Sequence, residues 1–311
     1  IESVLDHYRL PEGAVWAEPI SLAVPSALGF SLGDRVAFVA KDSGEQLGWL
    51  EVDSIDPFDW ALISKRWFGT TDIRHPGVRR LKESGDRFIG GRVSLERRRI
   101  PNFSAYALTP SQMRAIFAQR GWDRVVAFHT RNPPHCAHEY VQKRALERSG
   151  ADGLLIHPVM GEKAADDFPG EIVLAAYEAL INARYPLGRV LLAGYFSNHW
   201  HGGQREAVHH ALCRKNYGCS HFVVGRDHAG VGDFYEPNAA RALFARLGDI
   251  GIEPLFIDEV IYDPDSQSYR EISSGGGTPG SLAISGTQIR RYFSQGQTPP
   301  VWMMREEVSA V

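Results

Sequence analysis

The feature that most constrains the fold of this chain is a regular alternation of apolar runs and helical segments between residues 110 and 257. Strands are expected in this region at 124–128, 153–159, 189–194, 221–224 and 254–257. Helical patterns precede and separate them, at 110–120, 136–149, 170–184, 204–216 and 237–247. Strands that alternate with helices of this length indicate βαβ units and a mostly parallel sheet. We therefore predict an α/β fold with a Rossmann-like parallel sheet for residues 109–311.

The first third of the chain has a different pattern, and we expect two domains. A chain of 311 residues is longer than a single small hydrophobic core usually stabilises. Residues 1–108 contain short apolar runs, such as 36–39 and 49–52, which Gly, Asp and Pro turns separate. Little helical periodicity is visible there, so we predict a β-rich domain. Residues from about 258 to 311 are more irregular and are expected to form a small C-terminal subdomain of the second domain.

Composition and charge argue against several classes of protein. A net charge of −3 and a pI of about 6.5 give no sign of nucleic-acid or anionic-membrane partners. No run approaches the ~18 apolar residues that a membrane span needs. The cysteines Cys136, Cys213 and Cys219 lack C-x-x-C spacing, which argues against a disulfide framework and against a cysteine-based zinc site. We therefore expect a cytoplasmic protein, and from its start at Ile1 we expect a trimmed or partly ordered N-terminus.

A cluster of polar residues follows the expected strand 124–128. Arg131 and Asn132 lie in a turn, and His135 and His138 follow at the start of a helical pattern. A strand end, a donor-rich turn and a helix N-terminus form an anion site, because free N–H groups and the positive end of the helix dipole face one point. The histidine spacing lacks the glutamate and the i, i+4 pair of a zinc-protease helix. Phosphate binding is therefore favoured over the alternatives, which are metal binding and a structural role.

Further segments place similar groups at strand ends and helix starts. Residues 225–230 hold Arg226, Asp227 and His228 between glycines, which permit a ligand to approach the backbone closely. The simpler interpretation of this segment is a charged turn. Arg205 follows two glycines at the start of the helical pattern 204–216 and could contact an anion, or it could simply open an amphipathic helix.

The last segment of this kind, Ser285-Gly286-Thr287, offers hydroxyl and N–H groups before Arg290, and a helix cap is its simpler interpretation. The sequence suggests no Ser/His/Asp or Cys/His nucleophile, and it has no Gly-Lys-Ser/Thr phosphate loop. This pattern favours direct transfer, in which the protein positions two substrates and one attacks the other.

Several long runs are similar to those of the ATP sulfurylase (sulfate adenylyltransferase) family, and the resemblance covers nearly the whole chain. They are Phe68-Gly69-Thr70-Thr71, His75-Pro76-Gly77-Val78, Thr130-Arg131-Asn132-Pro133, His135-x-x-His138-Glu139, Arg214-Lys215-Asn216-Tyr217-Gly218-Cys219, the run 221–230, and Ile284-Ser285-Gly286-Thr287. The resemblance implies a PUA-like β-rich N-terminal domain, a nucleotidyltransferase domain of the HxGH type and a small C-terminal subdomain.

The resemblance also implies a reaction, its partners and its site residues. ATP and sulfate give adenylyl sulfate and pyrophosphate, with Mg²⁺ bound to the nucleotide, and a sulfate oxygen attacks the α-phosphorus in line. His135 and His138 would contact the phosphates, while Arg131, Arg205 and the residue at position 129 would contact the oxyanion. Family members are commonly homo-oligomers, so a dimer acting in sulfate assimilation is expected. The residues that would hold the nucleotide are Thr130, Asn132, His135, His138, Gly225, Arg226, Asp227, His228, Ile284, Ser285, Gly286 and Thr287.

The chain departs from the family pattern on the oxyanion side. His129 stands where the family usually has a sulfate-binding Gln, and residues 199–206 lack the usual Met-Arg pair. His129 could donate a hydrogen bond as Gln does, or add charge as an imidazolium. The segment from Ile261 onward has no cysteine for the zinc site of some bacterial members, so no zinc is expected. The alternatives are transfer to a phosphonate, sulfonate or phosphate ester, and a non-catalytic nucleotide-binding homologue.

Overall fold

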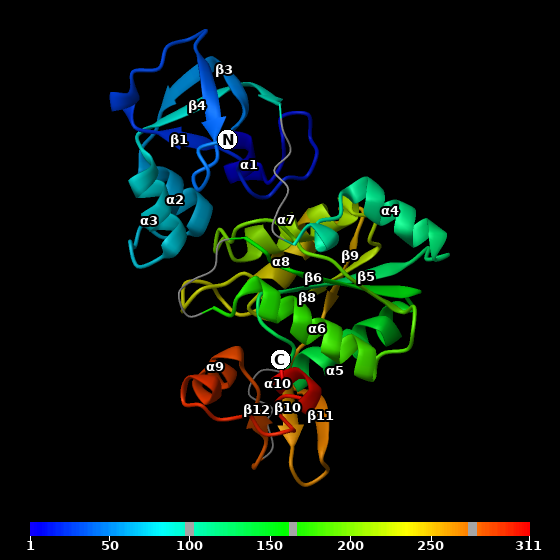
Figure 1. Ribbon diagram of the computed structural model, residues 1–311. Helices are drawn as coiled ribbons and strands as arrows, with labels where there is room; N and C mark the ends of the chain where they lie inside the picture. The colour runs from blue at the N-terminus through cyan, green and yellow to red at the C-terminus, as the bar shows by residue number, and fades with distance from the viewer. Residues whose placement is uncertain (97–102, 162–166, 273–278) are drawn as a thin grey trace. The chain divides into compact units, whose positions relative to one another are not determined.

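The computed structural model describes residues 1–96, 103–161, 167–272 and 279–311 (Figure 1). The chain divides into two compact units. The first unit comprises Ile1–Asn102, Trp200–His209 and Ala229–Ala239, and the second comprises Phe103–His199, His210–His228 and Ala240–Val311. Two segments from the second half of the chain thus belong to the first unit, which the sequence did not indicate. The domain boundary near residue 108 stays a prediction.

The first unit contains an antiparallel sheet, in the order β1-β4-β3-β2. Its strands are β1 (Leu22–Val24), β2 (Arg35–Val39), β3 (Gln46–Pro57) and β4 (Arg87–Leu95). Three helices accompany the sheet: α1 (Glu2–His7), α2 (Trp60–Phe68) and α3 (Pro76–Ser84). The expectation of little helix in this region was wrong for α2 and α3.

These two helices are short, which explains why their periodicity is hard to see in the sequence. Asp59 caps α2 by accepting hydrogen bonds from the amides of Ala61 and Leu62, and Gly69 ends the helix with a left-handed backbone. Ile63 and Trp67, four residues apart, are buried on one face. The His75 side chain caps α3, which has Pro76 in its first turn.

A buried carboxyl group lies in the first unit. Glu18 is 2% exposed, and its side chain accepts a hydrogen bond from the Trp67 indole. Burial, with a smaller contribution from the nearby carboxylate of Glu206, raises the pKa of Glu18 to about 8, although the Trp67 hydrogen bond opposes the shift. Glu18 is therefore largely protonated in the folded protein at neutral pH.

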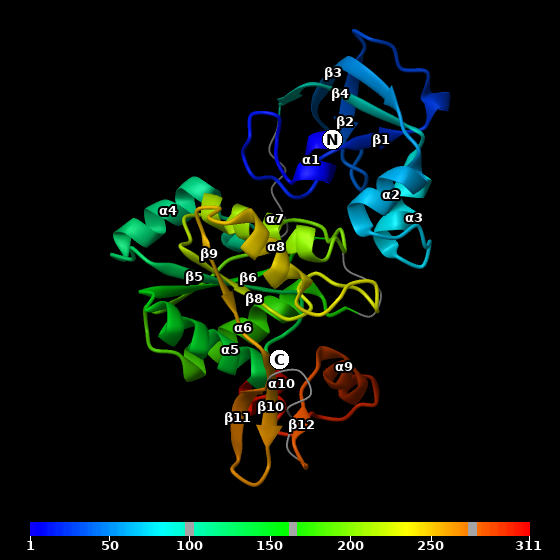
Figure 2. The same cartoon turned by 180° about the vertical axis from the view of Figure 1, so that it is seen from behind.

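The second unit is built on a five-stranded parallel sheet, in the order β7-β6-β5-β8-β9. Helices α5 and α6 cover one face, and α4, α7 and α8 lie toward the other (Figures 1 and 2). The strands are β5 (Val125–Thr130), β6 (Gly153–Pro158), β7 (Val190–Leu192), β8 (His221–Val224) and β9 (Glu253–Phe256). The helices are α4 (Pro110–Gln119), α5 (Cys136–Ser149), α6 (Gly170–Arg184), α7 (Gln204–Asn216) and α8 (Ala239–Leu247).

These elements confirm the predicted βαβ pattern, and most boundaries agree within one or two residues. Strands β5, β6 and β8 are buried along almost their full length, as expected for central strands covered on both faces. The division between the two units falls within α7, after His209.

The C-terminal part of the second unit forms a small antiparallel sheet, in the order β11-β10-β12. Its strands are β10 (Glu259–Asp263), β11 (Ser268–Ile272) and β12 (Leu282–Ala283), followed by α9 (Gly286–Ser294) and α10 (Glu306–Ser309). Ile289, Met303 and Met304 of this part join the hydrophobic core that contains Val126 and Phe128. Among the described residues, no helix has both the length and the apolar character needed to cross a membrane.

The buried Glu18 predicts how stability depends on pH. Its pKa in the folded protein, about 8, exceeds its ordinary value of 4.5. The stabilising contribution of its proton is therefore complete below about pH 4.5 and lost as pH rises through about 8. We expect Glu18→Gln, which keeps a neutral side chain of the same shape, to flatten the decline of the unfolding free energy between pH 6 and about 9 in urea titrations.

The exposed Glu12 supplies the matched control, since Glu12→Gln should leave the pH profile of the wild type unchanged. If Glu18→Gln followed the wild-type profile throughout this range, Glu18 would not hold its proton in the folded state.

Candidate functional site

The carboxyl end of β5 is where the structure collects the predicted site residues. β5 pairs in parallel with β6, where His129 lies opposite His157 and Thr130 opposite Pro158, and with β8 on its other side. The turn 131–135 after β5 and the turn 225–228 after β8 therefore start from the same edge of the sheet. Parallel sheets bind ligands beyond the carboxyl ends of their strands.

His135, which is buried, and His138, which is half-buried, form a stacked pair at the N-terminus of α5. Their ring centroids lie 3.6 Å apart with an interplanar angle of 21°. The His135 Nδ1 accepts the backbone N–H of His138 at 3.2 Å and so caps the helix. Because Nδ1 is an acceptor, the neutral ring carries its proton on Nε2, which is then a hydrogen-bond donor.

Both rings of this pair are neutral at physiological pH. Burial lowers the pKa of His135 well below its ordinary value, and the neighbouring His138 lowers it further. Burial also lowers the pKa of His138 to about 4, although a hydrogen bond with the Pro133 carbonyl opposes the shift. The pair can donate hydrogen bonds to phosphate oxygens, but it does not supply positive charge.

Several of the helix-terminal N–H groups that were expected to be free already have partners. The Cys136 amide donates to the Met303 carbonyl at 3.0 Å, and the His138 amide donates to His135 Nδ1. The Glu139 amide donates to the His135 carbonyl, the ordinary first bond of the helix. The side chains of the turn therefore matter more for anion binding than the helix N-terminus does.

The turn after β5 contacts the start of α9. The Thr130 hydroxyl accepts the Asn132 amide at 3.2 Å, and the Asn132 side-chain oxygen accepts from Arg290 at 3.1 Å. A side chain at Gly286 would come within 3.1 Å of the Asn132 amide nitrogen, so glycine lets the two segments approach closely. Two segments proposed to hold one ligand thus lie together.

The side chains of Ile284, Ser285 and Thr287 also make structural contacts. Ser285 and Gln288 form a capping box on α9, which realises the simpler interpretation of this motif. The Thr287 hydroxyl accepts from Arg290 at 3.3 Å, and Ile284 packs against the main core.

The turn after β8 carries the charged residues Arg226 and Asp227 near the surface. Arg226 donates to Glu259 at 2.7 Å and to Asp227 at 3.1 Å. Gly225 and Asp227 are exposed, and Arg226 and His228 are half-buried. Since Arg226 already contacts two carboxylates, its charge is largely compensated, and the exposed Gly225 and Asp227 are the groups best placed to meet a ligand.

The two arginines predicted to bind an oxyanion lie in different units. Arg131 is half-buried in the turn after β5, in the second unit. Arg205 is 4% exposed and lies in the first unit, where its guanidinium donates to backbone carbonyl groups. The acceptors are the carbonyls of Val4, Leu5, Ala17 and Arg66. Arg205 thus satisfies the carbonyls of α1, α2 and a loop, which is a structural role.

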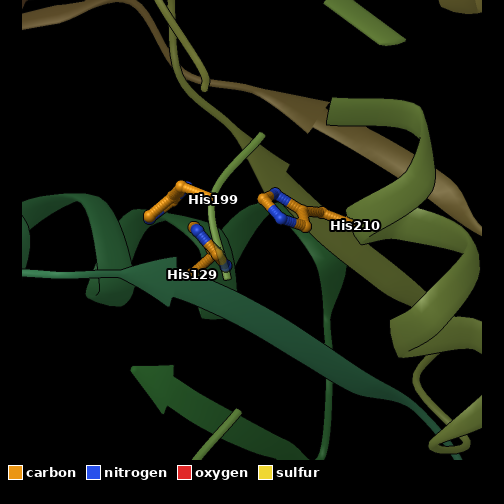
Figure 3. Close-up of side chains that lie close together, drawn as sticks. All are labelled: His129, His199 and His210. Carbon is orange, nitrogen blue, oxygen red and sulfur yellow. The ribbon is translucent and has the colours of Figure 1, made fainter. Parts of the chain in front are cut away.

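Four imidazoles gather beyond β5: His129, His199, His210 and His228. Figure 3 shows His129 from β5, His210 from α7 and His199 from a connecting segment, with their side chains directed toward a common space. The rings of His129 and His210 stack with centroids 4.1 Å apart and an interplanar angle of 27°. His210 Nδ1 lies 3.1 Å from His228 Nε2, so one of these rings donates to the other.

His129 is a neutral imidazole in this cluster. Burial lowers its pKa well below the ordinary value, and the nearby His210, Arg214, His228 and His199 lower it further. Of the two interpretations left open by the sequence, a hydrogen-bonding imidazole therefore fits the structure and an imidazolium does not.

His129, His199 and His210 also meet a simple distance criterion for a metal site, since one ring nitrogen from each lies within 4.8 Å of the others. Two observations weigh against a metal ion. The rings of His129 and His210 stack, so their lone pairs converge poorly on one ion. The Arg214 guanidinium, a cation, donates to His129 Nδ1 at 2.8 Å and so takes up the one lone pair that a neutral imidazole offers.

Sequence reasoning assigned no site role to Arg214, His157 or His210, which lie near His129. Arg214 is fully buried, with its guanidinium 3.8 Å from the Tyr195 ring centroid, and His157 is buried on β6. His210 and Arg214 are four residues apart on α7 and so share a helix face, a spacing visible in the sequence. The packing that turns this face toward β5 could not be read from the sequence.

The burial of Arg205 leads to a stability prediction. Removing its guanidinium takes a donor from buried carbonyl groups, and a buried group left unsatisfied costs about 1–3 kcal/mol. The Val4 carbonyl keeps the Tyr8 amide as a donor, so fewer groups than the four acceptors lose every partner. We expect Arg205→Met to lower the free energy of unfolding by roughly 2–4 kcal/mol in urea titrations. Arg79→Met, at an exposed position of α3, is the matched control and should stay within about 0.5 kcal/mol of the wild type. A stable Arg205→Met protein that had lost only anion binding would instead make Arg205 a ligand-binding residue.

Comparison with known protein families matches both parts of the chain. The ATP-sulfurylase family matches residues 104–311, and the PUA-like domain family matches residues 1–98. A sulfate adenylyltransferase of Symbiobacterium thermophilum is 44% identical over 313 residues, which is 99% of this chain and 79% of that protein. A sulfate adenylyltransferase of Thermococcus onnurineus is 39% identical over 320 residues, covering 100% of this chain and 81% of that protein.

One solved structure confirms the fold over almost the full length. It is described as a hexameric APS kinase from Thiobacillus denitrificans, and it superposes with a TM-score of 0.72 at 23% identity. The match covers 99% of this chain and 55% of that one. A PUA-like N-terminal part followed by an α/β part with a parallel sheet is therefore the fold of this chain.

Proposed function

The chain belongs to the ATP-sulfurylase family, and we propose that it transfers the adenylyl group of ATP to sulfate. A sulfate oxygen attacks the α-phosphorus, the bond from that phosphorus to the β-phosphate oxygen breaks, and pyrophosphate leaves. The products are adenylyl sulfate and pyrophosphate. The observation that carries the proposal is the full-length similarity to sulfate adenylyltransferases at 39–44% identity.

The same similarity decides between sulfate and the other acceptors. The relatives named above are sulfate adenylyltransferases, so a phosphonate, sulfonate or phosphate ester is not favoured as the acceptor, and neither is a non-catalytic role. The change at His129 fits this view, because a neutral imidazole can offer a hydrogen-bond donor as a Gln amide does.

We assign the site residues to two groups. His129 and Arg131 would bind sulfate, Arg131 by a forked, charge-assisted contact. His135 would donate from Nε2 to the ATP phosphates, and His138 would support it by stacking. Arg205 is left out of this assignment because its guanidinium binds backbone carbonyls. The nucleotide would lie between Thr130 and Asn132, the turn of Gly225, Arg226, Asp227 and His228, and the segment of Ile284, Ser285, Gly286 and Thr287.

Direct transfer is consistent with the chemistry of these residues. His129 and His135 are neutral donors that would stabilise charge developing on the substrates, beside the positive charge that Arg131 would supply. The transfer requires no covalent intermediate with the protein. ATP would enter as its Mg²⁺ complex, and a cytoplasmic homo-oligomer, a dimer, remains our prediction, consistent with three free cysteines.

His135 has two tasks that substitution can separate. Asparagine is a good helix cap but is too short to reach a phosphate from this position. We expect His135→Asn to keep the unfolding free energy within about 1 kcal/mol of the wild type while lowering kcat/KM for ATP about 100-fold in a pyrophosphate-release assay. His135→Ala should lose both stability and activity. Full activity in His135→Asn would remove His135 from the phosphate site.

A neutral His129 predicts a pH-independent affinity for sulfate. The pKa of His129 lies well below its ordinary value, so its charge does not change in the neutral range. We expect KM for sulfate to stay constant between about pH 6 and 8, measured at saturating ATP. An imidazolium would instead make KM for sulfate rise with pH, because the ring would lose its charge as pH passed a pKa of about 6.5. Such a rise, absent in His129→Gln, would contradict the neutral assignment.

A further inference from the structure

We infer that Arg214 is a positioning residue that holds His129 in the tautomer with its proton on Nε2, so that His129 offers a hydrogen-bond donor to the acceptor oxyanion. The inference rests on the proposed function, because it concerns how the sulfate site is set up. It adds a residue that lies outside the site assigned above.

The surrounding residues fix the position of Arg214. Its side chain is fully buried in the last turn of α7, where Nη2 donates to His129 Nδ1 at 2.8 Å. Nη2 also lies 3.4 Å from the His157 carbonyl oxygen, and Nη1 lies 3.5 Å from the His210 carbonyl oxygen. The Tyr195 ring lies against the guanidinium at 3.8 Å. Packing on several sides therefore holds the donor in place.

The guanidinium of Arg214 determines which nitrogen of His129 carries the proton. Arginine stays protonated in proteins and has no acceptor, so the bond to Nδ1 has only one possible direction. Nδ1 of His129 must supply its lone pair, and the proton of the neutral ring must lie on Nε2. The positive charge of Arg214 also opposes protonation of Nδ1, which would place two N–H groups face to face.

This tautomer presents a hydrogen-bond donor to the acceptor oxyanion. Sulfate carries no proton near neutral pH and can only accept hydrogen bonds. A histidine free to exchange tautomers would present a lone pair toward the oxyanion part of the time, which would repel it. The His129 ring reaches toward the space shared with His199 and His210 (Figure 3). With Nδ1 held by Arg214, Nε2–H is the nitrogen left to donate there.

The tautomer itself can be measured without any assay of activity. Long-range ¹H–¹⁵N spectra of protein labelled with ¹⁵N-histidine separate the two neutral tautomers, the imidazolium and a metal-bound ring. The signals of His129 are those that vanish in His129→Gln. We expect the Nε2–H form in the wild type at pH 7.5. The Nδ1–H form, an imidazolium or a metal-bound ring at His129 would overturn the inference.

Kinetics test whether the contact matters for the acceptor. Arg214→Met should raise KM for sulfate about 10- to 100-fold, the value of one hydrogen bond to a charged group, and should change KM for ATP less than threefold. In a His129→Ala background the same substitution should change KM for sulfate less than threefold, because the ring to be positioned is absent. Equal losses in both backgrounds would overturn the inference.

Two control variants distinguish the loss of this contact from a general loss of positive charge or of folding. Arg241→Met removes an exposed arginine of α8 that contacts Asp258 and should leave both KM values unchanged. Should Arg214→Met fail to fold, Arg214→Lys keeps the charge, and the spectrum of the wild type still decides the tautomer. Wild-type protein that releases no pyrophosphate from ATP and sulfate would refute the proposed function, whereas an Nε2–H signal would still support the tautomer.

Discussion

Strand β5 lies in the middle of the parallel sheet, and its hydrogen bonds to β6 and β8 determine where His129, Thr130 and the start of the following turn are placed. Its apolar residues Val125 to Phe128 are buried on both faces, so the strand cannot shift by a residue without exposing core or burying the turn. His129 is therefore directed toward α7, and the turn that follows leads to the cap of α5. Under the proposed function, the positions expected for the sulfate and phosphate groups follow from this one register.

The proposed site combines the charge of Arg131 with neutral hydrogen-bond donors. Burial keeps His129, His135 and His138 uncharged, and in two of these rings a donor to Nδ1 leaves the proton on Nε2. The donor is a backbone amide for His135 and a buried guanidinium for His129. Donors fixed in advance stabilise developing charge without reorganising during the reaction, which is how preorganised sites accelerate group transfer.

Much of this could be predicted from the sequence, because βαβ periodicity and the runs around Arg131 and Asp227 are local patterns. The contacts that could not be predicted depend on long-range packing. Arg205 begins a helix after two glycines, as an anion ligand would, yet the carbonyls of Val4 and Leu5, some 200 residues away in the chain, take up its donors. Arg214 drew attention only as part of a family motif, because its partner His129 lies on a strand 85 residues earlier.

The most direct test of this account is a crystal structure of the protein with adenylyl sulfate bound. We predict that the sulfate group lies within hydrogen-bond distance of His129 Nε2 and the Arg131 guanidinium. The adenylyl phosphate should face His135, and the nucleotide should lie along the turn that contains Asp227. A sulfate group bound away from His129 would contradict the account, as would anomalous density for a metal ion among His129, His199 and His210.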